Sequence, residues 1–140
     1  MRNHEKQKRG NHFMLKLTPG KEKGIKALSN KDGVIDALAI DQRGSLKKMI
    51  GAASGKEASQ KEIEDFKVAV SSELTPYSTG ILLDPQYVLP ASKARADGAG
   101  LLLAYERTGY DATEPGRFPD ILDDWSVRRL KEQGADAIKF

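Results

Sequence analysis

Four short apolar runs are spaced along the chain, and a longer segment of mixed polarity separates each run from the next. Strands of a parallel sheet covered by helices are typically uninterrupted apolar runs, because both faces of such a sheet are buried. The runs therefore predict parallel strands at residues 34–40, 80–83, 100–105 and 135–140. Parallel neighbours need crossover connections, and the segments between the runs are expected to supply them as helices.

Helix-capping residues stand between these runs. Thr18 followed by Pro19 has the form of an N-cap and a first helical residue, which predicts a helix over residues 19–29. Ser59 and Glu62 form a capping box at the start of a second helix. The buried stripe expected on that helix consists of Ile63, Phe66, Val70 and Leu74.

The later connectors carry fewer helix signals. Pro85 and Pro90 are expected to delay the helix start after the second run, which leaves a short helix at residues 92–97. Gly134 stands just before the last run, where a helix commonly ends with a residue in the left-handed region. Residues 108–119 are rich in turn formers and are expected to be a loop.

The alternation of strand and helix allows two architectures, a doubly wound sheet and a (β/α)8 barrel. A dinucleotide-binding sheet would carry G-x-G-x-x-G after its first strand, whereas this chain has Asp41-Gln42-Arg43 there and no P-loop anywhere. We therefore expect an α/β fold, the N-terminal half of a (β/α)8 TIM barrel with about four parallel strands and intervening helices. The barrel domain would span residues 18–140 and stop inside its fourth strand, with the helix at residues 19–29 closing its floor.

Positive charge is concentrated at the start of the chain. Residues 1–26 hold eight Lys/Arg against two Asp/Glu, a net charge of +6, whereas the rest of the chain carries −3. No patch of interleaved aromatic residues accompanies this charge, so nucleic acid is not an expected partner. We expect residues 1–17 to be a basic, disordered extension, with Met14 as an alternative start.

Several classes of function are disfavoured by what the sequence lacks. There is no cysteine, and the only histidines, His4 and His12, lie in the extension, so we expect no metal site and no cofactor. No G-x-S-x-G motif indicates a serine nucleophile. No apolar stretch is long enough to span a bilayer and no secretory signal is present, so we expect a cytoplasmic protein without a membrane partner.

The candidate chemistry lies where the predicted strands end, because barrel enzymes place their active sites at the carboxyl ends of the strands. Strand alternation puts Asp41 and Lys139 on the interior face, with the small residues Ala39 and Ala137 beside them. By contrast, Asp84 and Glu106 are expected to begin solvated loops. The chain's two interior charges would thus face one cavity.

The expected roles follow from the side-chain types. Lys139 lies within an apolar run, where an unpaired ammonium is costly, so it should pair with a carboxylate or contact an anionic ligand. Asp41 is the natural partner. Arg43 offers a bidentate fork for phosphate, and Gln42 can donate a hydrogen bond to a carbonyl or hydroxyl oxygen.

Four strings, taken in order, resemble one enzyme family closely: VIDALAIDQRGSLKKM, SSELTPYSTGILLDPQYVLPAS, GAGLLLAYERTGYDAT and DDWSVRRLKEQGADAIKF. Between residues 21 and 140 the chain is similar to the class I tagatose 1,6-bisphosphate aldolases of the LacD type. The resemblance implies a (β/α)8 barrel that cleaves a phosphorylated ketose, tagatose 1,6-bisphosphate, to dihydroxyacetone phosphate and glyceraldehyde 3-phosphate. It implies a Schiff base without metal, in the catabolism of lactose and tagatose 6-phosphate.

Carried over by position, the resemblance implies that Lys139 is a catalytic residue that stabilises charge and orients the substrate. Asp41 would be a second catalytic residue, in contact with substrate hydroxyls or a lysine. Gln42 and Arg43 fall in the family's substrate-binding segment, whereas no role is carried over for Asp84. The Schiff-base lysine and the acid/base glutamate of the family belong to the second half of the barrel and are not in this sequence.

Two further interpretations stay open from the sequence. A related sulfosugar-phosphate aldolase would share the barrel and the same strand ends. A non-catalytic half barrel would instead self-associate through the open edges of its first and last strands. In either enzyme interpretation, we expect the chain alone to be inactive.

Overall fold

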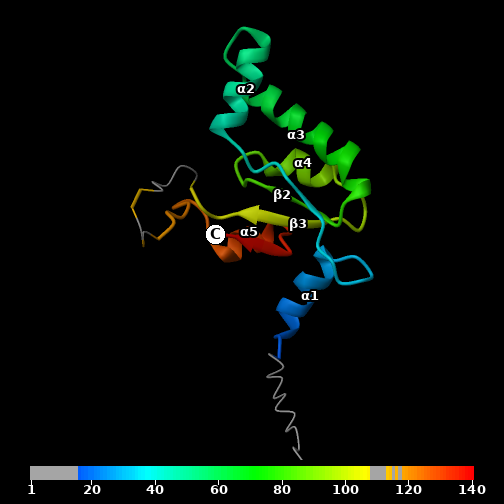
Figure 1. The fold of residues 1–140 in the computed structure, drawn as a ribbon. Coiled ribbons are helices and arrows are strands. Elements are labelled where there is room, and N and C mark those ends of the chain that lie inside the picture. Colours follow the sequence, from blue (N-terminus) through cyan, green and yellow to red (C-terminus); the bar gives the residue numbers. More distant parts are fainter. Residues whose placement is uncertain (1–15, 108–112, 115, 117) are drawn as a thin grey trace, which may run out of the picture.

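The computed structural model describes residues 16–107, 113–114, 116 and 118–140, in which parallel strands alternate with helices (Figure 1). The helical elements are α1 (Pro19–Leu28), α2 (Gly44–Ser54), α3 (Gln60–Leu74), the 3-10 turn η1 (Thr75–Tyr77), α4 (Val88–Ala94) and α5 (Val127–Glu132). The strands are β1 (Ala37–Ala39), β2 (Gly80–Leu83), β3 (Gly100–Ala104) and β4 (Ala137–Lys139).

The strands form one parallel sheet in the order β1-β2-β3-β4. Leu82 lies in register between Ala39 and Leu102, and Lys139 is the partner of Ala104. Each strand lies beside the next strand along the chain, which is the order that a barrel requires. The structure therefore confirms the predicted α/β fold of four consecutive parallel strands.

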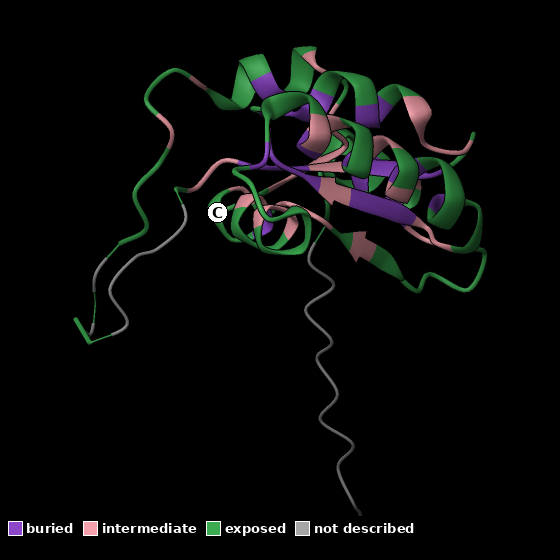
Figure 2. Cartoon of the chain, turned by 90° about the horizontal axis from the view of Figure 1, so that it is seen from above, coloured by how far each residue is buried: buried purple, intermediate pink, exposed green. Residues whose placement is uncertain are grey.

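The core lies on the helix-covered face of the sheet. Ile81, Leu83, Leu101 and Leu103 have no exposed surface, and they pack together with Leu130 of α5. Residues of α4 complete this cluster, while one residue from each edge strand, Leu38 and Ile138, packs against it. Buried residues gather where the helices meet the central strands (Figure 2). Alternation then directs the intervening residues of each strand to the opposite face.

Helix α1 packs against the amino ends of the central strands. Thr18 caps this helix by accepting a hydrogen bond from the backbone of Lys21, as the Thr18-Pro19 pair predicts. A Cβ atom added to Gly100 would lie 2.6 Å from the backbone oxygen of Ala27 and 2.6 Å from Leu28 Cδ2. The close approach explains why glycine begins β3, and it places α1 at the floor of the half barrel as expected.

The capping box of α3 is confirmed, but the predicted buried stripe is partly wrong. The Ser59 amide donates to Glu62 Oε2 at 2.8 Å.

The buried face of α3 differs from the predicted stripe. Ile63 is buried, whereas Phe66 is 42% exposed. Lys67 and Ser71 take the buried positions instead, spaced by four residues from Ile63. The helix is rotated so that Lys67 faces the sheet. The ion pair with the buried Asp84 stabilises this orientation. Leu74, near the end of the helix, is likewise exposed rather than buried, while Val70 packs against the core as predicted.

Other differences concern element boundaries. Helix α4 begins at Val88, earlier than predicted, because Pro90 falls in its first turn, where a proline removes no helical hydrogen bond. The first connector contains two helices, and α2 ends at Gly55, which has φ of +69°. Gly134 has φ of +92°, which confirms the predicted end of α5. The first and last strands are shorter than the apolar runs that predicted them.

The prediction of a disordered extension falls on residues 1–17, of which all but Lys16 and Leu17 lie outside the described residues. Much of the predicted loop at residues 108–119 also lies outside them. In the described part of the chain, no helix is long and apolar enough to cross a membrane.

Candidate active site

One lysine and two carboxylates meet at the carboxyl ends of three strands. Lys139 Nζ donates a hydrogen bond to Asp41 Oδ2 at 2.9 Å and forms an ion pair with Glu106 Oε1 at 3.0 Å. Both carboxylate side chains are 13% exposed, whereas the lysine side chain is 44% exposed. The predicted pairing of Asp41 with Lys139 is present, and Glu106 is a second partner rather than the start of a solvated loop.

The sheet register produces this convergence. Ile138 packs on the helix-covered face, so Lys139, the next residue, emerges on the opposite face. The Tyr105 amide donates to the Lys139 carbonyl at 2.8 Å, which places Glu106 just past the end of β3 and beside Lys139. The Ile40 amide donates to the Leu82 carbonyl at 2.9 Å, so Asp41 leaves β1 at the same end of the sheet.

The cluster favours the charged form of its lysine. The hydrogen bond to Asp41 is the main cause that raises the pKa of Lys139; the ion pair with Glu106 adds to it, and partial burial opposes it. Lys139 is therefore an ammonium at neutral pH. In this state it can donate hydrogen bonds and stabilise negative charge, but it has no free electron pair with which to attack a carbonyl.

Gln42 and Arg43 continue from Asp41 into α2, and each is held by a different contact. Arg43 Nη2 donates to the Glu106 carbonyl at 2.9 Å, while Arg43 Nε is buried without a hydrogen-bond partner among the described residues. The Gln42 side chain is exposed, but its backbone carbonyl accepts a hydrogen bond from Lys67 Nζ at 2.9 Å. The predicted substrate-binding segment thus lies beside the lysine cluster, with part of the Arg43 fork already engaged.

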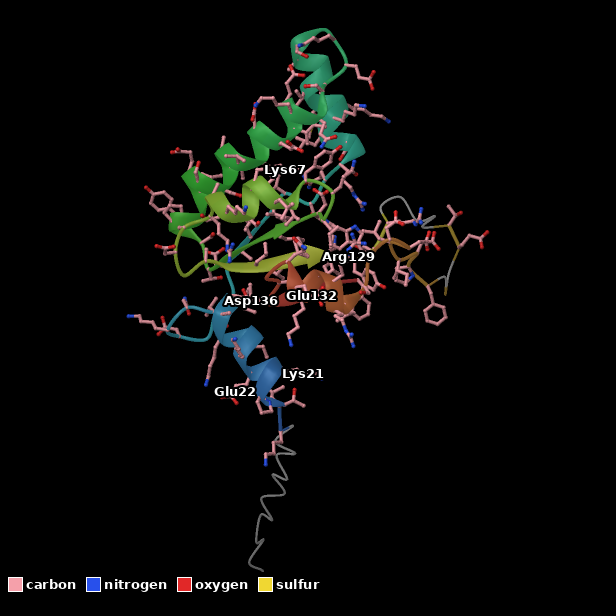
Figure 3. All side chains as sticks on the ribbon, turned by 180° about the vertical axis from the view of Figure 1, so that it is seen from behind. Lys21, Glu22, Lys67, Arg129, Glu132 and Asp136 are labelled. Carbon is pink, nitrogen blue, oxygen red and sulfur yellow. The ribbon has the colours of Figure 1, made fainter. Side chains whose placement is uncertain are left out.

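A second lysine–carboxylate pair lies nearby and was missed by sequence reasoning. Lys67 of α3 forms an ion pair with Asp84, which follows β2, and both side chains have no exposed surface. Figure 3 labels Lys67 on this helix. Asp84 Oδ1 also accepts hydrogen bonds from the amides of Gln86 and Tyr87, at 3.0 and 3.2 Å. The expectation that Asp84 begins a solvated loop is therefore wrong. The available signal was a lysine four residues after Ile63 on a capped helix, a position that hydrophobicity alone assigns to solvent.

The charged groups that meet at this end of the sheet are the Lys139 amine, the Asp41 and Glu106 carboxylates and the Arg43 guanidinium. No group of three or more His, Cys, Asp or Glu side chains suited to a metal ion occurs among the residues that the structure describes. The charged residues on the inner side of the strand ends can hold a polar, anionic molecule and can stabilise charge that develops on it. They do not supply an unprotonated amine.

A family profile and individual relatives both show that this chain is similar to aldolases. The family profile described as DeoC/LacD family aldolase matches residues 35–140. A tagatose 1,6-diphosphate aldolase of Enterococcus faecalis is 65% identical over 127 residues, which are 91% of this chain and 38% of that protein. A tagatose 1,6-diphosphate aldolase of Listeria monocytogenes is 60% identical over 127 residues, and one of Streptococcus pyogenes is 56% identical over 126. The chain spans about 38% of the length of these relatives.

Proposed function

We propose, from the premise that this chain belongs to the DeoC/LacD aldolase family, that it supplies the N-terminal half of a barrel that cleaves tagatose 1,6-bisphosphate. The products would be dihydroxyacetone phosphate and glyceraldehyde 3-phosphate. Residues 18–140 would form the barrel portion, working in the cytoplasm within lactose and tagatose 6-phosphate catabolism. The single observation that supports this function best is the meeting of Lys139, Asp41 and Glu106 at the carboxyl end of the sheet, where barrel enzymes carry out their chemistry.

The proposed reaction is a Schiff-base aldol cleavage. A lysine from the second half of the barrel would condense with the substrate ketone at C2 and release water. The protonated imine withdraws electrons, so the C3–C4 bond can break to give an enamine instead of a bare carbanion, while the C4 hydroxyl loses its proton and becomes an aldehyde. The imine-forming lysine and the glutamate that moves this proton would both come from outside the present sequence.

The residues of this chain would bind and orient the substrate. Lys139, held as an ammonium by Asp41, would donate hydrogen bonds to substrate oxygens and stabilise negative charge as it develops. Asp41 would accept hydrogen bonds from substrate hydroxyls with the oxygen it does not share with Lys139. Gln42 and Arg43 would contact the substrate, with Arg43 suited to a phosphate group. Asp41 and Glu106 already offset the charge of Lys139, so the support for a phosphorylated substrate comes from Arg43, whose Nε has no hydrogen-bond partner among the described residues.

A chimera offers the direct test. This chain would replace the matching segment of the Enterococcus faecalis relative, and cleavage of tagatose 1,6-bisphosphate would be followed by coupled detection of dihydroxyacetone phosphate. We expect the chimera to be active and this chain alone to give the background rate. Lys139→Met in the chimera should lower kcat by about a hundredfold, the size of effect typical when one charge-stabilising donor is lost.

Borohydride trapping would separate the roles of the lysines in the same chimera. With dihydroxyacetone phosphate present, the stable adduct should form on a lysine of the second half and should persist in the Lys139→Met variant. An adduct on Lys139 itself would contradict the proposed role of that residue. A chimera that folds but cleaves no tagatose 1,6-bisphosphate would contradict the function, and a panel of phosphorylated ketoses and sulfosugar phosphates would then identify any other substrate.

A second candidate function is self-association of the half barrel. Neither the outer edge of β1 nor that of β4 pairs with another strand in the described residues, and Val34, Ile35 and Phe140 near these edges are 55%, 50% and 76% exposed. Unpaired strand edges pair readily with a second copy. Light scattering of the purified chain should then give a mass of at least twice the 15.4 kDa of one copy. A stable monomer with both edge strands protected from hydrogen exchange would exclude this candidate.

A further inference from the structure

Lys67 makes three contacts from a position with no solvent exposure. Its ammonium forms an ion pair with Asp84, donates to the Gln42 carbonyl at 2.9 Å, and lies 5.3 Å from the centre of the Tyr87 ring. The three partners come from the segment after β1 and the segment after β2, whereas Lys67 itself belongs to α3. A single buried side chain therefore joins three segments of the chain just past the ends of two strands.

If Lys67 served stability alone, its ion pair with Asp84 would be sufficient. A buried ammonium requires a compensating charge, and Asp84 provides it. The hydrogen bond to Gln42 adds a different kind of constraint, because its acceptor is the main chain between Asp41 and Arg43. These two neighbours contact the other charged groups of the site: Asp41 accepts from Lys139, and Arg43 donates to the Glu106 carbonyl.

We propose that Lys67 is a positioning residue of the candidate active site, which fixes the Gln42 carbonyl and thereby sets the placement of Asp41 against Lys139. The role of Asp84 is to hold the Lys67 side chain in place by an ion pair in which neither side chain is exposed. Lys67 touches neither the proposed substrate nor the reacting atoms, so it acts only through the segment of residues 41–43. The inference rests on the proposed function for its catalytic consequence but not for its structural one.

The test uses two variants that differ in what they leave buried. Lys67→Met alone removes the hydrogen bond to the Gln42 carbonyl and also leaves the buried Asp84 carboxylate without its counter-charge. This variant is therefore expected to be much less stable. Lys67→Met combined with Asp84→Asn removes both charges, and the oxygen of the new side-chain amide can still accept the two backbone hydrogen bonds. The double variant therefore isolates the loss of the Gln42 contact, with folding verified by circular dichroism and thermal unfolding.

The readout is the reactivity of Lys139 in the full chain toward limiting acetic anhydride, measured by mass spectrometry relative to the exposed Lys21. Only the unprotonated amine reacts, so loss of the Asp41 contact should speed acetylation of Lys139. Asp41→Asn sets the scale of complete loss. We expect the folded double variant to reach at least half of the increase seen with Asp41→Asn. An increase below that half, or an unchanged Lys139 rate, in the folded double variant would overturn the proposal, since Lys67 would then serve stability alone.

Activity gives the second readout and keeps the two proposals apart. In the active chimera, the double variant should lower kcat/KM by about tenfold, because small displacements of positioned groups have effects of this size or larger. A kcat/KM equal to that of the parent chimera would count against positioning. If the parent chimera itself is inactive, the proposed function fails, while the acetylation of Lys139 still decides whether Lys67 positions Asp41.

Discussion

Two lysines lie near the same end of the sheet, and they differ in how far they are buried. Lys67, on α3, has no exposed surface and pairs with the equally buried Asp84. Lys139, on the last strand, faces the other side of the sheet, is 44% exposed, and pairs with two carboxylates. The same pair of functional groups thus forms a fully buried ion pair in one place and a partly exposed charged cluster in the other. Burial, rather than residue type, decides which role a lysine–carboxylate pair takes.

The largest difference between the pairs should appear when each lysine is removed. Lys67→Met leaves a buried carboxylate without its partner, which should lower the free energy of unfolding by about 3–5 kcal/mol. Urea denaturation followed by circular dichroism would measure this change. The matched control, Lys67→Met with Asp84→Asn, should recover much of the loss because no charge stays buried. A loss below about 1 kcal/mol for the single variant would mean that the pair behaves as a surface contact.

Lys139→Met should change stability less. Lys139 is 44% exposed, but the Asp41 and Glu106 side chains that it would leave unpaired are each 13% exposed, so the free energy of unfolding should fall by about 1–2 kcal/mol, between the ranges of exposed and buried ion pairs. The same denaturation measurement applies, with wild type and Lys67→Met run beside it. A loss as large as that of Lys67→Met would remove the contrast between the two lysines and would indicate that the Lys139 cluster is a structural element.

The two carboxylate partners of Lys139 should differ in their influence on its acidity. Asp41 is the larger cause of the raised pKa and Glu106 the smaller, so Asp41→Asn should lower the pKa of Lys139 more than Glu106→Gln does. The pH dependence of Lys139 acetylation, compared between the two variants, would measure this order. Equal effects would contradict this order and show that the two carboxylates influence the pKa of Lys139 alike.

The smallest expected effect is a pH dependence of stability. The pKa of Lys139 is raised above its ordinary value of 10.5 in the folded chain, so its contribution is complete below that pH and is lost as the pH rises through the folded-state pKa. The difference in unfolding free energy between wild type and Lys139→Met should therefore be constant near neutral pH and shrink at strongly alkaline pH. A difference that grows with pH would contradict the raised pKa.

The sequence carried enough information to predict the Lys139 site but not the Lys67 site. Strand alternation and an ammonium inside an apolar run pointed to Asp41 as the partner of Lys139, and the structure shows that pair. The sequence alone places Glu106 in a solvated loop, because no local pattern gives the strand register that brings Glu106 beside Lys139. The sequence alone indicates no role for Lys67, since a lysine on an amphipathic helix is ordinarily a surface residue.

What the sequence determined by itself was the series of parallel strands, their covering helices and the face on which the interior charges emerge. These features depend on local periodicity and capping, which neighbouring residues decide. Only the tertiary structure determined the rotation of α3, which exposes Phe66 and buries Lys67, and the placement of Asp84 beneath that helix. The physical reason is that burying a charge is favourable only where a distant segment supplies its partner, and that proximity exists only once the chain has folded.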